Sequence, residues 1–226
     1  MKKHYTAPFM RIILMFAVLF SAQAAFGQIL WDGGGDGTSW NDAANWAGDV
    51  VPPADSLVAF EMDAVVTGTV SAAHARINVR NRAVVTFNLN INIGNGVTSE
   101  HSLVVGTGST LNIAAGRTVT LQPSTDKQAL PIFATADTAV IHIAAGATLR
   151  ILQGNNGINI VNVNSTLVND GVILMSSAVK NGIKSAGTFI NNGIVSLDHL
   201  STDGIIVGAY LKITVRSPFP NPWTTA

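Results

Sequence analysis

Between residues 65 and 215, hydrophobic and polar residues alternate in short runs that small or bend-forming residues separate. Residues 111–113 read Leu-Asn-Ile and residues 119–121 read Val-Thr-Leu. Alternation with a period of two is typical of β-strands that bury one face. Sustained helical periodicity is absent from the sequence. The pattern therefore predicts a chain that is almost entirely β.

These runs recur as one repeated sequence motif, here called the phrase. The copy at 111–121 repeats almost position for position at 141–151, and looser copies follow at 167–174 and 189–197. The glycines of the four copies, at positions 116, 146, 171 and 193, lie 30, 25 and 22 residues apart. Such spacing is typical of solenoid coils, each of which buries its apolar face against the next coil.

The composition of the phrase favours tight corners between short strands. Ala-Ala-Gly at 114–116 and 144–146 allows a sharp bend, because glycine accepts a positive φ. The chain is 47% hydrophobic and contains no cysteine, so apolar burial and backbone hydrogen bonds must hold the fold. We predict a right-handed parallel β-helix (a β-solenoid) with an N-terminal Trp/Gly-rich cap. A β-sandwich remains the alternative, although it would not require a recurring phrase.

The N-terminus has the pattern of a secretory signal peptide. Three cations lie in the first eleven residues, residues 12–20 form an apolar stretch, and residues 22–24 supply a small-x-small cleavage pattern. The apolar stretch is shorter than the ~20 residues that span a bilayer. We therefore expect residues 1–27 to be removed after Ala24 or Gly27, leaving no membrane span in a secreted or cell-surface protein.

A tryptophan- and glycine-rich segment follows at residues 28–60. It contains Trp31, Trp40 and Trp46 and continues through a Val-Pro-Pro sequence at 51–53. This segment resembles the opening of bacterial secreted β-solenoid and autotransporter-like, adhesin-like surface proteins, which often carry a W-x-G…G-x-W…N-W…V-P…D-x-V pattern before the first coil. The resemblance implies an exported, repeat-built surface protein, with repeats here at residues 61–216.

Two interpretations of the tryptophans stay open. As a cap, Trp31, Trp40 and Trp46 would cover the apolar end and free strand edge of the solenoid. As a ligand-binding platform, they would stack on the pyranose rings of a glycan. We prefer the cap. The nearby aspartates match no calcium-binding loop spacing, so we predict neither a metal nor a cofactor.

The C-terminal residues 217–226 read Ser-Pro-Phe-Pro-Asn-Pro-Trp-Thr-Thr-Ala. This phrase resembles the start of the C-terminal sorting domain of the type IX secretion system, which continues for many residues beyond such a phrase. The resemblance implies that the chain is truncated. The alternative is a simple Pro-rich tail.

Catalytic chemistry is not indicated by the sequence. Acidic residues are missing between Asp137 and Asp170, and the histidines have no metal-ligand spacing. Alternation turns His142 outward as a solitary, solvent-facing side chain. The cluster Asp198, His199 and Ser201 resembles a triad only in sequence, because neighbouring residues of a strand point to opposite faces. We predict no catalytic residues.

Asparagines gather at residues 155–164, where Asn159, Asn162 and Asn164 are expected at or near the surface and corners. In stacked coils such residues can form side-chain ladders.

The charge balance limits the classes of partner that the protein is expected to bind. Formal net charge is zero and 12% of residues are charged, which argues against nucleic-acid binding. We expect a non-enzymatic, secreted or cell-surface structural segment that is adhesin-like and contacts extracellular glycans or neighbouring cell-surface proteins. The alternative is a carbohydrate-binding or polysaccharide-degrading β-helix protein.

Overall fold

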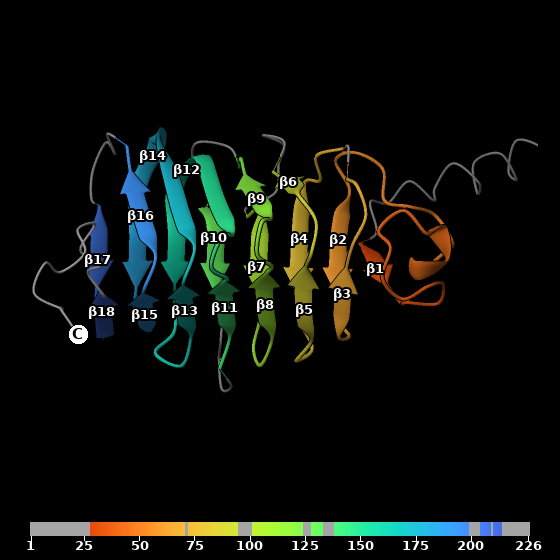
Figure 1. The fold of residues 1–226 in the computed structure, drawn as a ribbon, viewed down its shortest axis with the longest axis horizontal. Coiled ribbons are helices and arrows are strands. Elements are labelled where there is room, and N and C mark those ends of the chain that lie inside the picture. The colour runs from red at the N-terminus through yellow and green to blue at the C-terminus, as the bar shows by residue number, and fades with distance from the viewer. Residues whose placement is uncertain are drawn as a thin grey trace, which may run out of the picture.

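The computed structural model describes residues 28–70, 72–94, 101–123, 128–132, 138–198, 204–208 and 210–213. The predicted signal peptide and the Pro-rich tail lie outside these residues. The described chain is nearly all β and forms a parallel β-solenoid of about six turns, which confirms the predicted β-helix (Figure 1). Among the described residues, helices with the length and hydrophobicity to cross a membrane are absent.

The elements are short and follow one another closely. They are β1 (Ile29–Trp31), η1, a 3₁₀ helix (Ala43–Asn45), β2 (Leu57–Phe60), β3 (Ala64–Val66), β4 (Arg76–Val79), β5 (Val84–Phe87), β6 (Ile91–Ile93), β7 (Leu103–Val105), β8 (Thr110–Ile113), β9 (Thr118–Leu121), β10 (Gln128–Ile132), β11 (Val140–Ile143), β12 (Thr148–Ile160), β13 (Thr166–Asn169), β14 (Val172–Ser185), β15 (Thr188–Asn191), β16 (Ile194–Leu197), β17 (Ile205–Val207) and β18 (Tyr210–Ile213).

The strand pairings define three faces that run along the solenoid. The first face contains β1, β2, β4, β7, β10, the C-terminal parts of β12 and β14, and β17. The second face contains β3, β5, β8, β11, β13, β15 and β18. The third face contains β6, β9, the N-terminal parts of β12 and β14, and β16. Since β12 and β14 each pair on both the first and third faces, they join these two faces.

The repeated phrases lie in register. On the second face Leu111 pairs with Ile141, Ile141 with Leu167, and Leu167 with Phe189. These are the first residues of the four phrases found in the sequence, so each phrase occupies the same place in its coil. The predicted repeats are therefore confirmed as successive turns of the solenoid.

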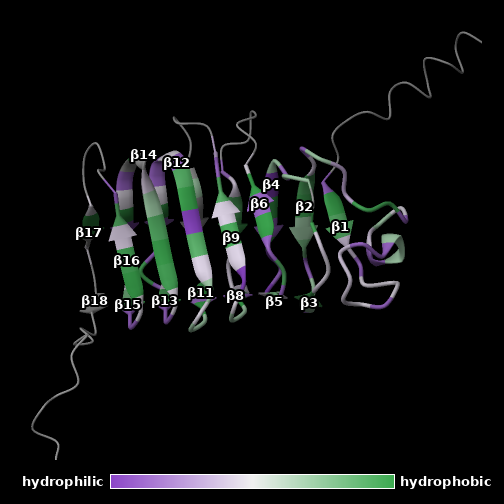
Figure 2. Ribbon diagram, turned by 45° about the horizontal axis from the view of Figure 1, so that its top comes forward, coloured by the Kyte–Doolittle hydropathy of each residue, from purple (hydrophilic) through white to green (hydrophobic). Residues whose placement is uncertain are grey.

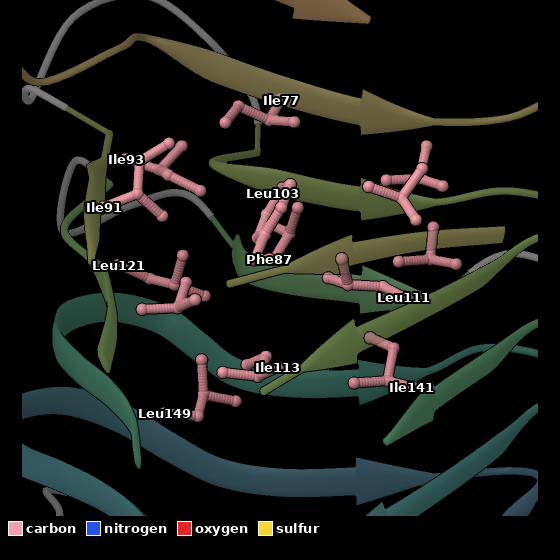
Figure 3. Packing of buried hydrophobic residues seen from close by; sticks show 14 of the residues in the cluster. Ile77, Phe87, Ile91, Ile93, Leu103, Leu111, Ile113, Leu121, Ile141 and Leu149 are labelled. Atoms are coloured by element: carbon pink, nitrogen blue, oxygen red, sulfur yellow. The ribbon is translucent and has the colours of Figure 1, made fainter. Parts of the chain in front are cut away.

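Apolar side chains at alternate strand positions fill the interior. Figure 3 shows Ile93, Leu111, Leu121 and Leu149 among the side chains packed between the faces. All four are at most 1% exposed. Figure 2 shows hydrophobic residues lying mainly on the strands. Burial of apolar surface, at about 25 cal/mol per Å², holds the coils together in the absence of disulfides.

Two asparagines replace apolar residues in the interior of the later coils. Asn169 and Asn191 occupy the inward positions that Ile113 and Ile143 hold in earlier coils. Asn169 is fully buried and its Nδ2 donates to Asn191 Oδ1 at 2.6 Å and to the Ile194 carbonyl at 3.1 Å. These bonds satisfy the Asn169 amide nitrogen, whereas its Oδ1 is buried without a hydrogen-bond partner.

The asparagine contacts at 155–164 differ from the expected ladder. Asn181 Nδ2 donates to Asn156 Oδ1 at 2.8 Å across adjacent coils. Asn159 instead pairs in register with Lys184, while Asn162 Oδ1 accepts the backbone N–H of Asn164. The long β12 extends to Ile160 on the first face, and the pairing of β12 with β14 brings Asn156 opposite Asn181 in the next coil.

Candidate functional site

The three tryptophans of the N-terminal segment form one buried cluster at the first coil. Trp31, Trp40 and Trp46 are 1%, 2% and 0% exposed. The Trp46 ring centroid lies 4.9 Å from that of Trp31, 4.7 Å from that of Trp40 and 5.9 Å from that of Phe60 in β2. Trp46 Nε1 donates to the Trp40 carbonyl at 2.9 Å, so the polar atom of this buried indole is satisfied.

A hydrogen-bonded loop holds these rings in place. The buried Asn45 accepts the backbone N–H groups of Gly35 at 3.0 Å and Gly37 at 2.8 Å through Oδ1. Its Nδ2 donates to Asp36 Oδ1 at 2.8 Å and to the Ser39 carbonyl at 2.9 Å. One amide therefore ties both ends of the glycine-rich loop together.

The aspartates of this loop are hydrogen-bond acceptors. Backbone N–H groups of Ser39 and Thr38, together with the Asn45 amide, lower the pKa of Asp36 to about 2. Asp42 is the N-cap of η1, and its Oδ1 accepts the Ala44 N–H at 3.1 Å. Such bonds stabilise the charged carboxylate. Within the described residues, groups of three or more metal-ligating side chains are absent.

The tryptophan cluster has consequences for sugar binding. The structure brings Trp31, Trp40 and Trp46 together, but each indole is covered by the other rings and by Phe60. A pyranose ring needs an open aromatic face, and these buried rings offer none. The cluster closes the first coil, where β1 pairs with β2 and Trp31 also forms an isolated antiparallel bridge with Trp46.

His74 lies buried beside this cap. Its ring centroid is 4.8 Å from that of Trp40, and its Nδ1 is 3.3 Å from Ser56 Oγ. The Nε2 atom is buried without a hydrogen-bond partner. Burial lowers the pKa of His74 below its usual value, against the opposing effects of the Pro53 carbonyl and the Asp55 carboxylate. Burial therefore favours the neutral form of this imidazole in the folded protein.

We expect acid to destabilise the protein through His74. The unfolded imidazole has a pKa of about 6.5, and the folded pKa is lower, so the unfolded state binds more protons between the two values. This contribution to stability is complete above about pH 6.5 and is lost as pH falls toward the folded pKa. Thermal unfolding at a series of pH values should show the melting temperature falling in this window. His74→Gln should flatten the slope, and an identical slope in both proteins would contradict the assignment.

A second group of polar side chains lies on the outer side of the second face. Thr86, Asn112 and His142 occupy equivalent outward positions in consecutive coils. Asp170 and Asn192 follow in the next two coils, one residue after β13 and β15 end. We call these five residues the polar line.

Hydrogen bonds connect members of the polar line. His142 Nε2 lies 2.7 Å from Asp170 Oδ2, and Asn192 Nδ2 donates to Asp170 Oδ1 at 2.8 Å. Asn112 Nδ2 donates to Thr86 Oγ1 at 3.4 Å. The His142 and Asp170 side chains are 39% and 34% exposed. The line is therefore open to solvent while its side chains hold one another in place.

The sequence analysis missed this arrangement. His142 does point outward, as alternation predicted, but it is paired with a carboxylate 28 residues later rather than solitary. The repeat contained the signal: aligning the phrases places Val168 beside His142, and Asp170 is two positions further along. Of the sequence-adjacent cluster at 198–201, only Asp198 lies within the described residues.

Shallow depressions mark the outer surface. One of about 200 Å³ lies on the third face and includes Arg150, Leu174, Ser176 and Asp198 in its lining. It lies beside an irregularity in the pairing of β12 with β14, where the register shifts between Ile151 and Gln153. An irregularity of this kind bends the strand locally.

The fold and these sites define a class of protein, a capped parallel β-solenoid with an apolar interior. Neither the family models, nor the curated proteins, nor the solved structures contain a match to this chain.

Proposed function

We propose that the chain is a non-enzymatic structural segment of a secreted or cell-surface protein, with an adhesin-like role. The observation that supports this most directly is the in-register stack of about six turns, closed at one end by the tryptophan cap. Each coil lengthens such a rod by about 4.8 Å. A rod of this kind can hold two regions of a protein apart or present a contact surface to a partner. Neither role requires an active-site cavity.

The outer surface of the second face suits contact with a broad partner. One of its outward rows includes five uncharged, β-branched residues, namely Val84, Thr110, Val140, Thr166 and Thr188, and continues in register to Tyr210 of β18. Flat, weakly charged surfaces of this type favour many weak contacts over one deep pocket. The resemblances at residues 28–60 and 217–226, together with the signal pattern at 1–27, support delivery to the surface of a bacterial cell.

The location of the protein in the cell and its attachment to cells or glycans test the proposal. Antibody labelling of intact cells that produce the full chain should detect it at the surface or in the medium. Beads coated with purified residues 28–226 should be retained on cells or extracellular glycans more than uncoated beads. A chain that stays inside the cell, or beads retained no better than uncoated ones, would overturn the adhesin-like role.

The third-face depression favours a second candidate, a polysaccharide-degrading protein. Arg150 and Asp198 supply a cation and a carboxylate in its lining, which are groups used in sugar chemistry. Incubation with soluble polysaccharides followed by an assay for newly formed chain ends separates the two candidates. We expect no release of fragments. Release that disappears in Arg150→Gln and Asp198→Asn would instead establish the enzyme.

A further inference from the structure

The polar line runs along the solenoid axis rather than across it. Its members come from successive coils, and parallel pairing places coils about 4.8 Å apart. Thr86, Asn112 and His142 share one register row. A molecule bound to the line must therefore be extended and must present similar groups at regular intervals along the axis.

The chemistry of the line favours hydroxyl groups as its partners. Asn112 and Asn192 combine amide donors with carbonyl acceptors, and Asp170 supplies two acceptor oxygens. Asp170 is the line's acidic member and His142 is its bonded neighbour. Polyanions such as nucleic acids require clusters of cations, which this line lacks, whereas neutral polyols can donate to the carboxylate and exchange hydrogen bonds with the amides.

The side chains beside the line complete this environment. Val140 and Thr166 stand in the neighbouring outward row, and Val168 lies in register with His142. Their methyl groups offer apolar contact next to the hydrogen-bonding groups. A sugar ring has this same combination, with hydroxyl groups at its rim and C–H groups on its faces.

We propose that the polar line binds a neutral polysaccharide chain lying parallel to the solenoid axis. This inference rests on the proposed adhesin-like function and names the class of its partner. The coil spacing is close to the length of one sugar unit in an extended chain, so successive sugars meet successive coils. His142 and Asp170 lie on adjacent coils and contact two adjacent sugars, and Asn112 and Asn192 contact the sugars on either side of that pair.

The mutual hydrogen bonds reduce the cost of binding. Asp170 is held by Asn192 and orients His142, so these side chains lose less freedom when a ligand binds. The surface is flat, so each sugar binds weakly. Affinity arises from repetition, because each additional unit binds as part of the same molecule.

Titration with β-linked glucose oligomers tests the proposal. The dimer, tetramer and hexamer are added to folded residues 28–226 labelled for NMR, and shifts are followed at Asn112, His142 and Asn192. We expect shifts on the second face and an affinity that rises about tenfold or more from dimer to hexamer. Asp170→Ala should weaken hexamer binding about tenfold, as expected for loss of a hydrogen bond to a charged group.

Matched variants keep the result interpretable. Thr120→Ala removes an outward hydroxyl from the third face and should leave affinity unchanged. Because Asp170 also holds the side chains of His142 and Asn192, a second variant is needed. Asp170→Asn, which retains the side-chain shape, should show the same weakening if the carboxylate binds sugar. Equal affinities for Asp170→Asn and Thr120→Ala, or an absence of hexamer binding, would overturn the glycan assignment.

The outcome separates this inference from the function on which it rests. Beads that still attach to cells while the hexamer fails to bind would refute the polar line and leave the adhesin-like role standing. Hexamer binding by a chain that never reaches the cell surface would support the line and refute that role.

Discussion

Replacing Trp46 with alanine is expected to lower the free energy of unfolding by about 3–5 kcal/mol. Trp46 is fully buried and contacts the rings of Trp31, Trp40 and Phe60. Its removal leaves a large cavity and also exposes the edge of the first coil. Chemical denaturation followed by circular dichroism, with the linear extrapolation of unfolding free energy, measures the loss.

The control for this variant is Val50→Ala in the same segment. Val50 is 59% exposed, so its truncation should change stability by no more than about 0.5 kcal/mol. A Trp46→Ala protein as stable as Val50→Ala would mean that the tryptophan cluster is not needed to close the solenoid. Glycan binding at the polar line should persist in any folded Trp46→Ala protein, because the two sites lie in different coils.

The sequence predicted the fold from two independent regularities. Alternation identified Leu111 and Ile113 as inward residues, and the repeat at 141–151 identified the residues stacked on them. Both follow directly from backbone geometry, since a strand places successive side chains on opposite faces and a solenoid places equivalent positions one coil apart. Local regularities of this kind can be identified from the sequence alone.

Contacts between coils with unequal lengths were harder to predict. Alternation from Leu167 places Asn169 inward, although asparagine is more typical of bends than of a buried strand position. The cost of its burial is reduced because Asn191 lies in register and accepts its hydrogen bond, as does the Ile194 carbonyl. His74 presents the same difficulty, since its contact with Trp40 joins the cap to a corner 34 residues away. Such contacts depend on the paths that the loops follow, and the amino-acid composition of a loop does not determine its path.

Glycine at the corners illustrates how one residue type serves two physical needs. Gly116 and Gly146 adopt φ values of 72° and 79°, as predicted from the Ala-Ala-Gly corner. Gly171 is outside that left-handed range and is required for a different reason. A Cβ there would lie 2.5 Å from the Ala144 carbonyl oxygen and would also overlap that of Ala147, both in the preceding coil.

Replacing Gly171 with alanine is therefore expected to destabilise the protein by about 3 kcal/mol, the upper part of the range for overpacking. The obstructing atoms are backbone carbonyls, and the Ala147 carbonyl also accepts the Val172 N–H at 2.9 Å, so relief requires the two coils to separate. The matched control is Gly116→Ala, whose Cβ would meet no atom within 4 Å and whose penalty is only the positive φ, about 1–2 kcal/mol. Denaturation of both variants tests this order. A smaller loss for Gly171→Ala than for Gly116→Ala would show that the close approach of the two coils does not require glycine at position 171.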